Sequence, residues 1–206
     1  MDRKNRAGAL KLAGALTLGI IVGAAGYASL AAGEGAPAIE PADRRLLHEL
    51  AAKDEIREQI YNYARGLDRM DMELSKRVWH PDGTADYIGF YEGTGAGFVD
   101  FVWPLHEAMT AHSHQITNVL IEVDGDTAVS EAYVMASLHT QTADGATTPL
   151  VRSRYADTWS KRDGRWAIDH RLAITDFRTL SVADEPGEPT EGRRDRGDPS
   201  YQQYPF

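Results

Sequence analysis

The sequence contains no cysteine. This absence excludes a thiol nucleophile, a disulfide bond and a thiolate metal site, whatever compartment the protein occupies. Any chemistry must therefore come from histidine, aspartate, glutamate, tyrosine, arginine or serine side chains.

Positive charge is also scarce. Lysine and arginine number 22 against 31 aspartates and glutamates, which gives a formal net charge of −9. Such a surface repels phosphate backbones and anionic lipid, so a nucleic acid is not an expected partner. The remaining composition, 42% apolar and 26% charged over 206 residues, is typical of one globular domain or a little more.

The N-terminus has the basic-then-apolar order of an export signal. Arg3, Lys4, Arg6 and Lys11 precede an uncharged run at residues 12–33. Two outcomes stay open: cleavage of residues 1–33 as a signal peptide, or their retention as a membrane anchor, because 22 uncharged residues suffice to span a bilayer. In either case the rest of the protein is expected to be exported, as a secreted, periplasmic or envelope-associated protein.

Composition divides the rest of the chain into three parts. Residues 34–43 are rich in glycine, alanine and proline without periodicity and are expected to form a linker. Residues 181–206 are rich in proline, glycine and charge and are expected to be a mobile tail. Residues 44–180 remain for a single core.

Hydrophobic periodicity predicts helices in the first half of this core. A long helix ends near residues 68–70, and its buried stripe comprises Ile56, Ile60, Tyr63, Ala64 and Leu67. A short helix around residues 74–79 follows and stops at the turn-forming sequence of residues 80–83. A third helix is expected at residues 95–111, bent at Pro104.

From residue 114 onward the hydrophobic period changes to 2, and three Asp-Gly pairs separate alternating runs. The expected strands cover residues 114–123, 127–142, 148–162 and 165–178. Helices followed by a long antiparallel meander predict an α+β domain, in which the helices pack on a strongly curved sheet around an apolar pocket. We expect the functional site in that pocket.

Two histidines and an asparagine mark the first strand. His112 and His114 form a His-x-His pair, but no third ligand stands at a familiar spacing, so a metal site is the least favoured hypothesis. His114 and Asn118 share a face with the apolar residues of the same strand. A histidine and an asparagine in an apolar row need partners or a ligand.

Later strands carry further candidates. On the second strand Tyr133, Met135 and His139 share one face, which is expected either to line the pocket or to be a solvated sheet face. On the third strand Arg152 and Arg154 alternate, and the sequence leaves open which of them is a surface charge and which meets a carboxylate or an anionic intermediate. On the fourth strand His170 falls in register with an apolar row, where a satisfied core histidine is the commoner outcome.

Six stretches of the core share a pattern with a known family. They are Tyr-Ala-Arg-Gly-Leu-Asp at 63–68, His-Pro-Asp-Gly at 80–83, His-Gln-Ile-Thr-Asn at 114–118, Val-Asp-Gly-Asp-Thr-Ala at 123–128, Arg-Tyr-Ala-Asp at 154–157 and Asp-Gly-Arg-Trp-Ala-Ile-Asp-His-Arg at 163–171. In this order they resemble a SnoaL-like domain of the nuclear transport factor 2 superfamily. The resemblance implies a cone-shaped barrel with a deep apolar pocket open at one end. It says less about function, because one scaffold hosts many activities.

Catalytic relatives in this superfamily include scytalone dehydratase, a bile-acid dehydratase, hexachlorocyclohexane dehydrochlorinase, ketosteroid isomerase and the SnoaL polyketide cyclases. Dehydratase-type members use an Asp of the first helix with a His of the sheet, and Asp68 and His114 match those two places. Tyr63 resembles the tyrosine that stands five residues before that Asp in the bile-acid dehydratase. His139 sits where scytalone dehydratase has a second histidine, and Arg154 is a weaker candidate for a cavity arginine.

These matches predict a small-molecule lyase or isomerase that needs no cofactor. His114 would remove a proton, while Asp68 holds the tautomer of the imidazole and stabilises its charged form. Tyr63 and His139 would donate hydrogen bonds to developing charge. An apolar cyclic substrate, such as a steroid or polyketide, would contact Asn118, Tyr133, Met135, Arg154 and His170. The alternative is a non-catalytic ligand-binding or dimeric assembly module, and the resemblance implies a homodimer or other homo-oligomer.

Overall fold

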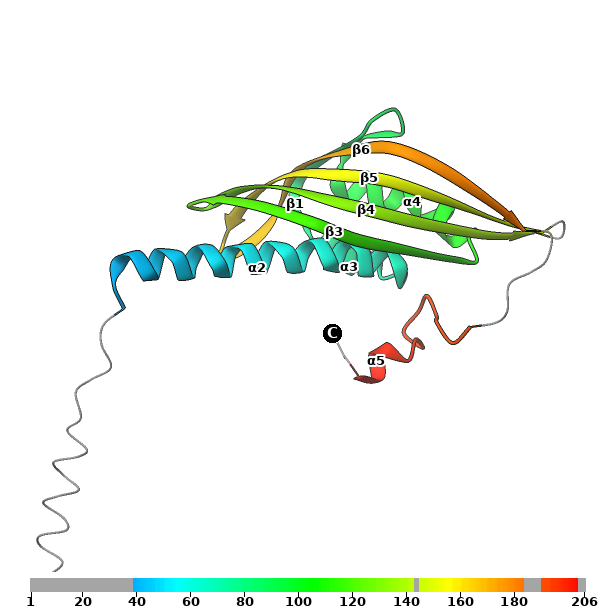
Figure 1. Ribbon diagram of the computed structural model, residues 1–206, viewed down its shortest axis with the longest axis horizontal. Coiled ribbons are helices and arrows are strands. Elements are labelled where there is room, and N and C mark those ends of the chain that lie inside the picture. The colour runs from blue at the N-terminus through cyan, green and yellow to red at the C-terminus, as the bar shows by residue number, and fades with distance from the viewer. Residues whose placement is uncertain (1–38, 143–144, 184–189, 204–206) are drawn as a thin grey trace, which may run out of the picture. The chain divides into compact units, whose positions relative to one another are not determined.

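The computed structural model describes residues 39–142, 145–183 and 190–203 (Figure 1). The predicted leader at residues 1–33 lies outside these ranges. The sheet lies within the compact unit formed by residues 45–206. None of the helices in the described ranges is long and apolar enough to cross a membrane.

Three helices precede the long strands, as the periodicity predicts. They are α2 (Pro41–Asp68), α3 (Met72–Arg77) and α4 (Gly95–Glu107), and a short α5 (Ser200–Gln203) lies near the C-terminus. The stripe expected on the first helix is confirmed, because Ile56, Ile60 and Leu67 are all buried. α2 begins inside the expected linker, and α4 ends four residues before the predicted end at residue 111.

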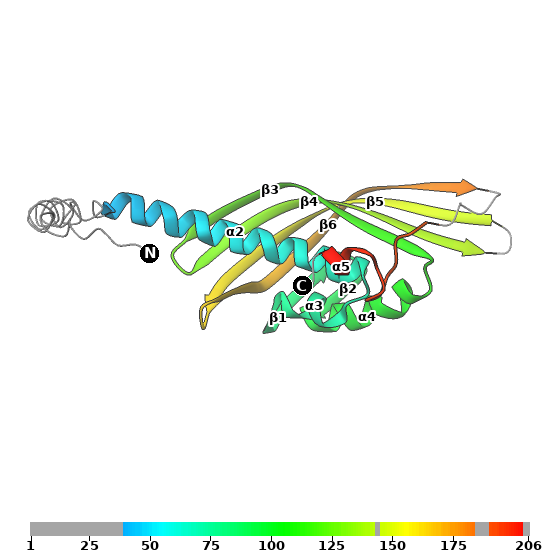
Figure 2. The ribbon, with the colours of Figure 1, turned by 90° about the horizontal axis from the view of Figure 1, so that it is seen from below.

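One sheet contains six strands in the order β2-β1-β6-β5-β4-β3. Their bounds are β1 (Trp79–Tyr87), β2 (Tyr91–Thr94), β3 (Ala111–Asp124), β4 (Thr127–Thr142), β5 (Gly145–Arg162) and β6 (Arg165–Ala183). Figures 1 and 2 show the C-terminal part of α2 lying along the concave side of the long curved strands. The α+β class and the curved sheet are confirmed. The sheet is open between β2 and β3 rather than closed into a barrel, and β1 pairs with β6 in parallel.

The sequence prediction lacks the first two strands. Residues 80–83 are predicted as a turn, yet they lie within β1. The register between β1 and β6 shifts between Trp79 and Thr84, so the turn-forming residues make an irregularity in an otherwise paired strand. Pairing of the flanking residues with β6 and β2 overrides the local turn propensity.

An ion pair under three aromatic rings fills the centre of the core. Arg171 and Asp157 are fully buried and join through two hydrogen bonds of 2.8 Å. The guanidinium lies 3.9 Å from the ring centroid of Tyr155, 4.5 Å from that of Tyr63 and 5.2 Å from that of Trp79. Cation–π contacts with the guanidinium help to hold these three rings in place in the core.

Irregularities in the long strands determine which face each side chain occupies. In β3 the register with β4 shifts between Thr117 and Leu120, and Asn118 has a left-handed φ of 49°. In β6 the register with β5 shifts twice, at residues 168–170 and at residues 175–177. One extra residue moves every later side chain of the strand to the other face, so uninterrupted alternation does not hold.

Candidate functional site

An apolar cavity of about 360 Å³ lies between α4, the end of α2 and one face of the sheet. We call this face the inner face and the opposite one the outer face. Apolar walls come from α4 (Phe98 and Val102) and from the strands (Val134, Ala136 and Val151). The polar groups on the lining are few, which is typical of a small-molecule site.

His114 and Asp68 meet at the wall of this cavity. Asp68 is the last residue of α2, and the His114 Nδ1 atom in β3 lies 2.7 Å from its Oδ1 atom. The backbone N–H of His114 donates to both oxygens of the same carboxylate, at 3.0 and 2.9 Å. The two side chains are 8% and 14% exposed. The structure therefore brings these two sequence candidates together in a largely water-excluded position.

This hydrogen bond assigns the roles of the two ring nitrogens of His114. A carboxylate accepts hydrogen bonds, so Nδ1 carries a proton, and in the neutral ring Nε2 then keeps its lone pair. His114 lines the apolar cavity, whereas Asp68 lines a separate hollow on the other side of the imidazole. Asp68 thus stands behind the ring and orients it, and Nε2 is available as a base.

The end of α2 explains why these residues meet. Met70 has a left-handed φ of 51°, and its N–H bonds to the carbonyl of Leu67. The next N–H bonds to the carbonyl before Leu67, which completes a Schellman motif. His112 places its Nε2 atom 2.8 Å from the same Leu67 carbonyl oxygen. These bonds tie the start of β3 to the end of α2 and hold Asp68 beside His114.

A further histidine, His106 of α4, also lines the cavity. Its ring centroid lies 4.5 Å from that of His112 and 6.0 Å from that of His114. Burial, with a smaller effect of the neighbouring imidazoles, lowers the pKa of His106 to about 3, and burial lowers the pKa of His112. Both rings are therefore neutral at neutral pH. His106 stands four residues after Val102 on the apolar stripe of the third predicted helix, and this spacing is the signal that could have found it.

A metal ion finds little support in this cluster of imidazoles. Within the described part of the chain, no group of three or more His, Asp or Glu side chains is placed to hold one. His112 has both nitrogens engaged, Nε2 with Leu67 and Nδ1 with the Arg194 guanidinium at 3.3 Å. The Nδ1 atom of His114 is bound to Asp68.

Tyr63 lies beneath the cavity rather than on its wall. It is 1% exposed, and its hydroxyl lies 2.9 Å from the hydroxyl of Tyr87. Tyr87 and Tyr155 line the cavity instead. Burial raises the pKa of all three phenols, so they stay protonated and can donate hydrogen bonds. Tyr87 is thus a better candidate than Tyr63 for contact with a ligand, and the sequence misses it because β1 is not predicted.

The face of β4 that lines the cavity is the opposite of the one considered from the sequence. Its cavity contacts come from residues 134, 136 and 138. Tyr133, Met135 and His139 alternate with these residues and therefore lie on the outer face. Tyr133 is 41% exposed, and the His139 Nδ1 atom lies 2.7 Å from the hydroxyl of Thr148. The solvated sheet face, which the sequence leaves open as an alternative, is the one observed.

Asn118 and His170 also lie away from the cavity. Asn118 is exposed at the irregularity of β3, which turns Val119 toward the core in its place. His170 is exposed, with its Nδ1 atom 2.8 Å from the hydroxyl of Thr84. The register shift at residues 168–170 turns Arg171 inward instead. His170 therefore does not lie in the apolar row expected from the sequence.

Arg154 is not the cavity arginine. It lies on the outer face of β5, where its guanidinium binds Asp176 at 2.9 Å and Glu131 at 3.3 Å. Among the described residues, the arginine that lines the cavity is Arg178 of β6. The register shift at residues 175–177 turns Phe177 outward and Arg178 inward.

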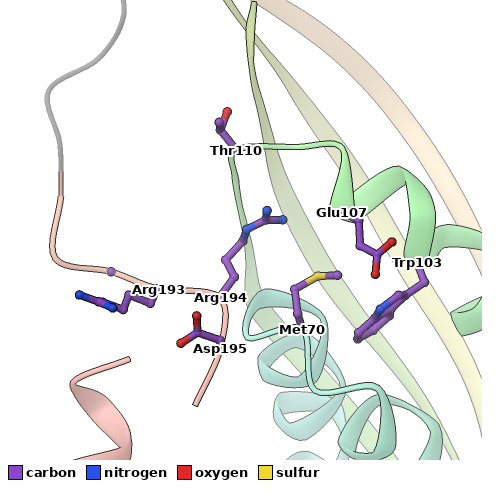
Figure 3. Close-up of a pocket in the computed structure, with 8 residues that line it drawn as sticks. Met70, Trp103, Glu107, Thr110, Arg193, Arg194 and Asp195 are labelled. Carbon is purple, nitrogen blue, oxygen red and sulfur yellow. The ribbon is translucent and has the colours of Figure 1, made fainter. Parts of the chain in front are cut away.

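Residues 190–203, which the sequence assigns to a mobile tail, contact the turn beside the site. Arg194 donates to the carbonyl of His106 at 2.6 Å and to that of Met109 at 2.5 Å. Figure 3 shows the polar hollow that this segment forms with Trp103 and its neighbours. Arg194 thus ties the chain near its C-terminus to the connection between α4 and β3.

Solved structures of similar fold include enzymes. A hexachlorocyclohexane dehydrochlorinase, LinA type 2, has 18% identity and a TM-score of 0.60 over 68% of this chain and 95% of its own. A scytalone dehydratase-like protein of Novosphingobium aromaticivorans has 20% identity and a TM-score of 0.57 over 68% and 97%. A protein of unknown function from Mycobacterium tuberculosis has 25% identity and a TM-score of 0.55 over 68% and 78%.

These identities establish a shared fold and leave the activity open. No curated protein matches the chain in sequence. The family model of the SnoaL-like domain matches residues 48–172, a range that contains both Asp68 and His114. This match confirms the resemblance seen in the six motifs. The chain therefore belongs to the SnoaL-like domain family.

Proposed function

We propose that the protein is a cofactor-independent lyase or isomerase acting on an apolar cyclic metabolite. The observation that carries this proposal is the hydrogen bond between Asp68 and His114 at the wall of an apolar cavity. The names of two similar structures support it, since dehydrochlorination and dehydration are both eliminations. Such reactions require removal of a proton next to a leaving group or a carbonyl.

In the proposed reaction the Nε2 atom of His114 accepts the proton. The imidazolium that forms lies against the Asp68 carboxylate, 2.7 Å from Nδ1, which stabilises the new charge. The apolar walls keep water from this charge pair and so strengthen the interaction between its members.

Neutral polar groups of the cavity would stabilise the negative charge that develops on the substrate. The imidazole of His106 lines the cavity. Its ring remains neutral because burial lowers the pKa to about 3. The residues that line the cavity also include the hydroxyl-bearing Tyr87, Tyr155, Ser153 and Thr175. Preorganised donors of this kind are commonly worth about 3 kcal/mol in the transition state.

Turnover of a panel of steroid, terpenoid and polyketide ring compounds, followed by mass spectrometry, tests the proposal. With an active substrate, His114→Ala and Asp68→Asn are each expected to lower kcat by about 10²–10⁴-fold, because they remove the base or its orienting group. His139→Ala and His170→Ala, both outside the cavity, are matched controls that should retain activity. Unchanged turnover by His114→Ala would contradict the proposed mechanism.

A further inference from the structure

The cavity wall opposite His114 carries an arginine. His114 pairs with Ala136 between β3 and β4, Ala136 with Val151 between β4 and β5, and Val151 with Arg178 between β5 and β6. All four residues line the cavity. One row of cross-strand neighbours therefore runs from the imidazole to the guanidinium.

The length of this row matches a ring compound. Three steps between strands, each about 4.8 Å, separate the backbones of His114 and Arg178 by about 14 Å. The two residues between them, Ala136 and Val151, are short and apolar, so a fused ring system can lie over them. Longer side chains at both ends reach toward such a ring from opposite sides. A cavity of about 360 Å³ is large enough to hold a ligand of this size.

The charge of Arg178 is available to a ligand. Its side chain is exposed at the cavity, and the described part of the chain provides no ion pair or hydrogen bond to its guanidinium. None of the described residues lining the cavity is acidic. Arg154 and Arg171, by contrast, each bind a carboxylate of the protein.

We propose that Arg178 binds a carboxylate of the substrate. The substrate class is then an apolar ring compound that carries a carboxylate at the end opposite the carbon deprotonated by His114. A guanidinium presents two parallel N–H donors that fit the two oxygens of a carboxylate. The orientation of the ring relative to His114 rests on the proposed function, whereas binding of the carboxylate does not.

Calorimetric titration with 2-naphthoate and 2-naphthamide tests this site, because the two probes share a ring system and differ in charge. The wild-type protein is expected to bind 2-naphthoate at least about tenfold more tightly, the gain of a charge-assisted pair over a neutral one. Arg178→Gln should remove this preference while the affinity for 2-naphthamide stays unchanged. Arg178→Lys should retain part of it, and Arg152→Gln, on the outer face, should retain all of it.

Several outcomes would overturn the proposal. These are equal affinity of the wild-type protein for the two probes, no binding of 2-naphthoate at millimolar concentration, and an undiminished preference in Arg178→Gln. His114→Ala separates this site from the proposed function, because it should lose turnover and keep the carboxylate preference. If turnover survives in His114→Ala while Arg178→Gln loses the preference, the proposed function fails and the carboxylate site stands.

Discussion

The two faces of the sheet use arginine in opposite ways. On the outer face, Arg154 forms partly solvent-exposed ion pairs with Asp176 and Glu131. On the inner face, Arg171 and Asp157 are completely buried. Breaking a solvated pair costs little, whereas removing one partner of a buried pair leaves a charge without solvent or counter-ion. An arginine–carboxylate pair is therefore expected to contribute little to stability on the outer face and much on the inner face.

Removal of Arg171 should have the largest effect on stability. Arg171→Met is expected to lower the free energy of unfolding by about 3–5 kcal/mol, because the Asp157 carboxylate stays buried without its partner. Arg154→Met is the matched change on the outer face and should alter stability far less. Urea denaturation followed by circular dichroism measures both variants. Similar losses in the two variants would show that the faces do not differ in this way.

A smaller effect is expected from pH through the inner-face histidine His106. Its pKa is about 3 in the folded protein, where burial disfavours the charged ring, against about 6.5 in the unfolded chain. The unfolded chain therefore binds more protons below pH 6.5, and stability falls as the pH decreases toward 3. At pH 5 the loss from this one group is about 2 kcal/mol.

Thermal unfolding at pH 7, 6 and 5 measures this dependence. The lowered pKa of His112 acts in the same direction. His106→Phe should make the decline in melting temperature between pH 7 and 5 shallower than in the wild-type protein. His170→Phe, at an exposed histidine, should leave that decline unchanged. Identical slopes for His106→Phe and the wild-type protein would mean that His106 is not buried in its neutral form.

The smallest effect on stability is expected at the irregularity of β3, after which successive side chains of the strand change faces. Asn118 has a left-handed φ of 49°, which a β-branched residue adopts only with strain. Asn118→Val is expected to cost about 1 kcal/mol in unfolding free energy, and Asn118→Gly is expected to cost less than about 0.5 kcal/mol. Chemical denaturation of both variants measures the difference. Equal stabilities would argue against a left-handed residue at this position.

The sequence predicts the long elements well, for a physical reason. Ile56, Ile60 and Leu67 present one continuous apolar face, and the strands after residue 114 alternate over many residues. Short β1 and β2 give no such signal. β1 in addition contains the turn-forming residues 80–83, whose strand conformation depends on pairing with β6.

The site is only partly predictable from the sequence. Asp68 and His114 follow from the resemblance and precede every irregularity of the long strands. The faces of Asn118 and His170 depend on register shifts, which are fixed by the partner strand rather than by the local sequence. The cavity position of Arg178 has the same origin. Export and oligomerisation stay predictions, because the leader lies outside the described residues and a single chain is described.

The proposed mechanism depends most on Asp68 holding His114 in the tautomer that leaves Nε2 unprotonated. Long-range ¹H–¹⁵N correlation spectra of histidine-labelled protein, recorded at about pH 8, where a free imidazole is neutral, show directly which ring nitrogen carries the proton. We expect the Nδ1–H form for His114 in the wild-type protein and loss of this preference in Asp68→Ala. An Nε2–H form in the wild-type protein, or spectra that Asp68→Ala leaves unchanged, would contradict it.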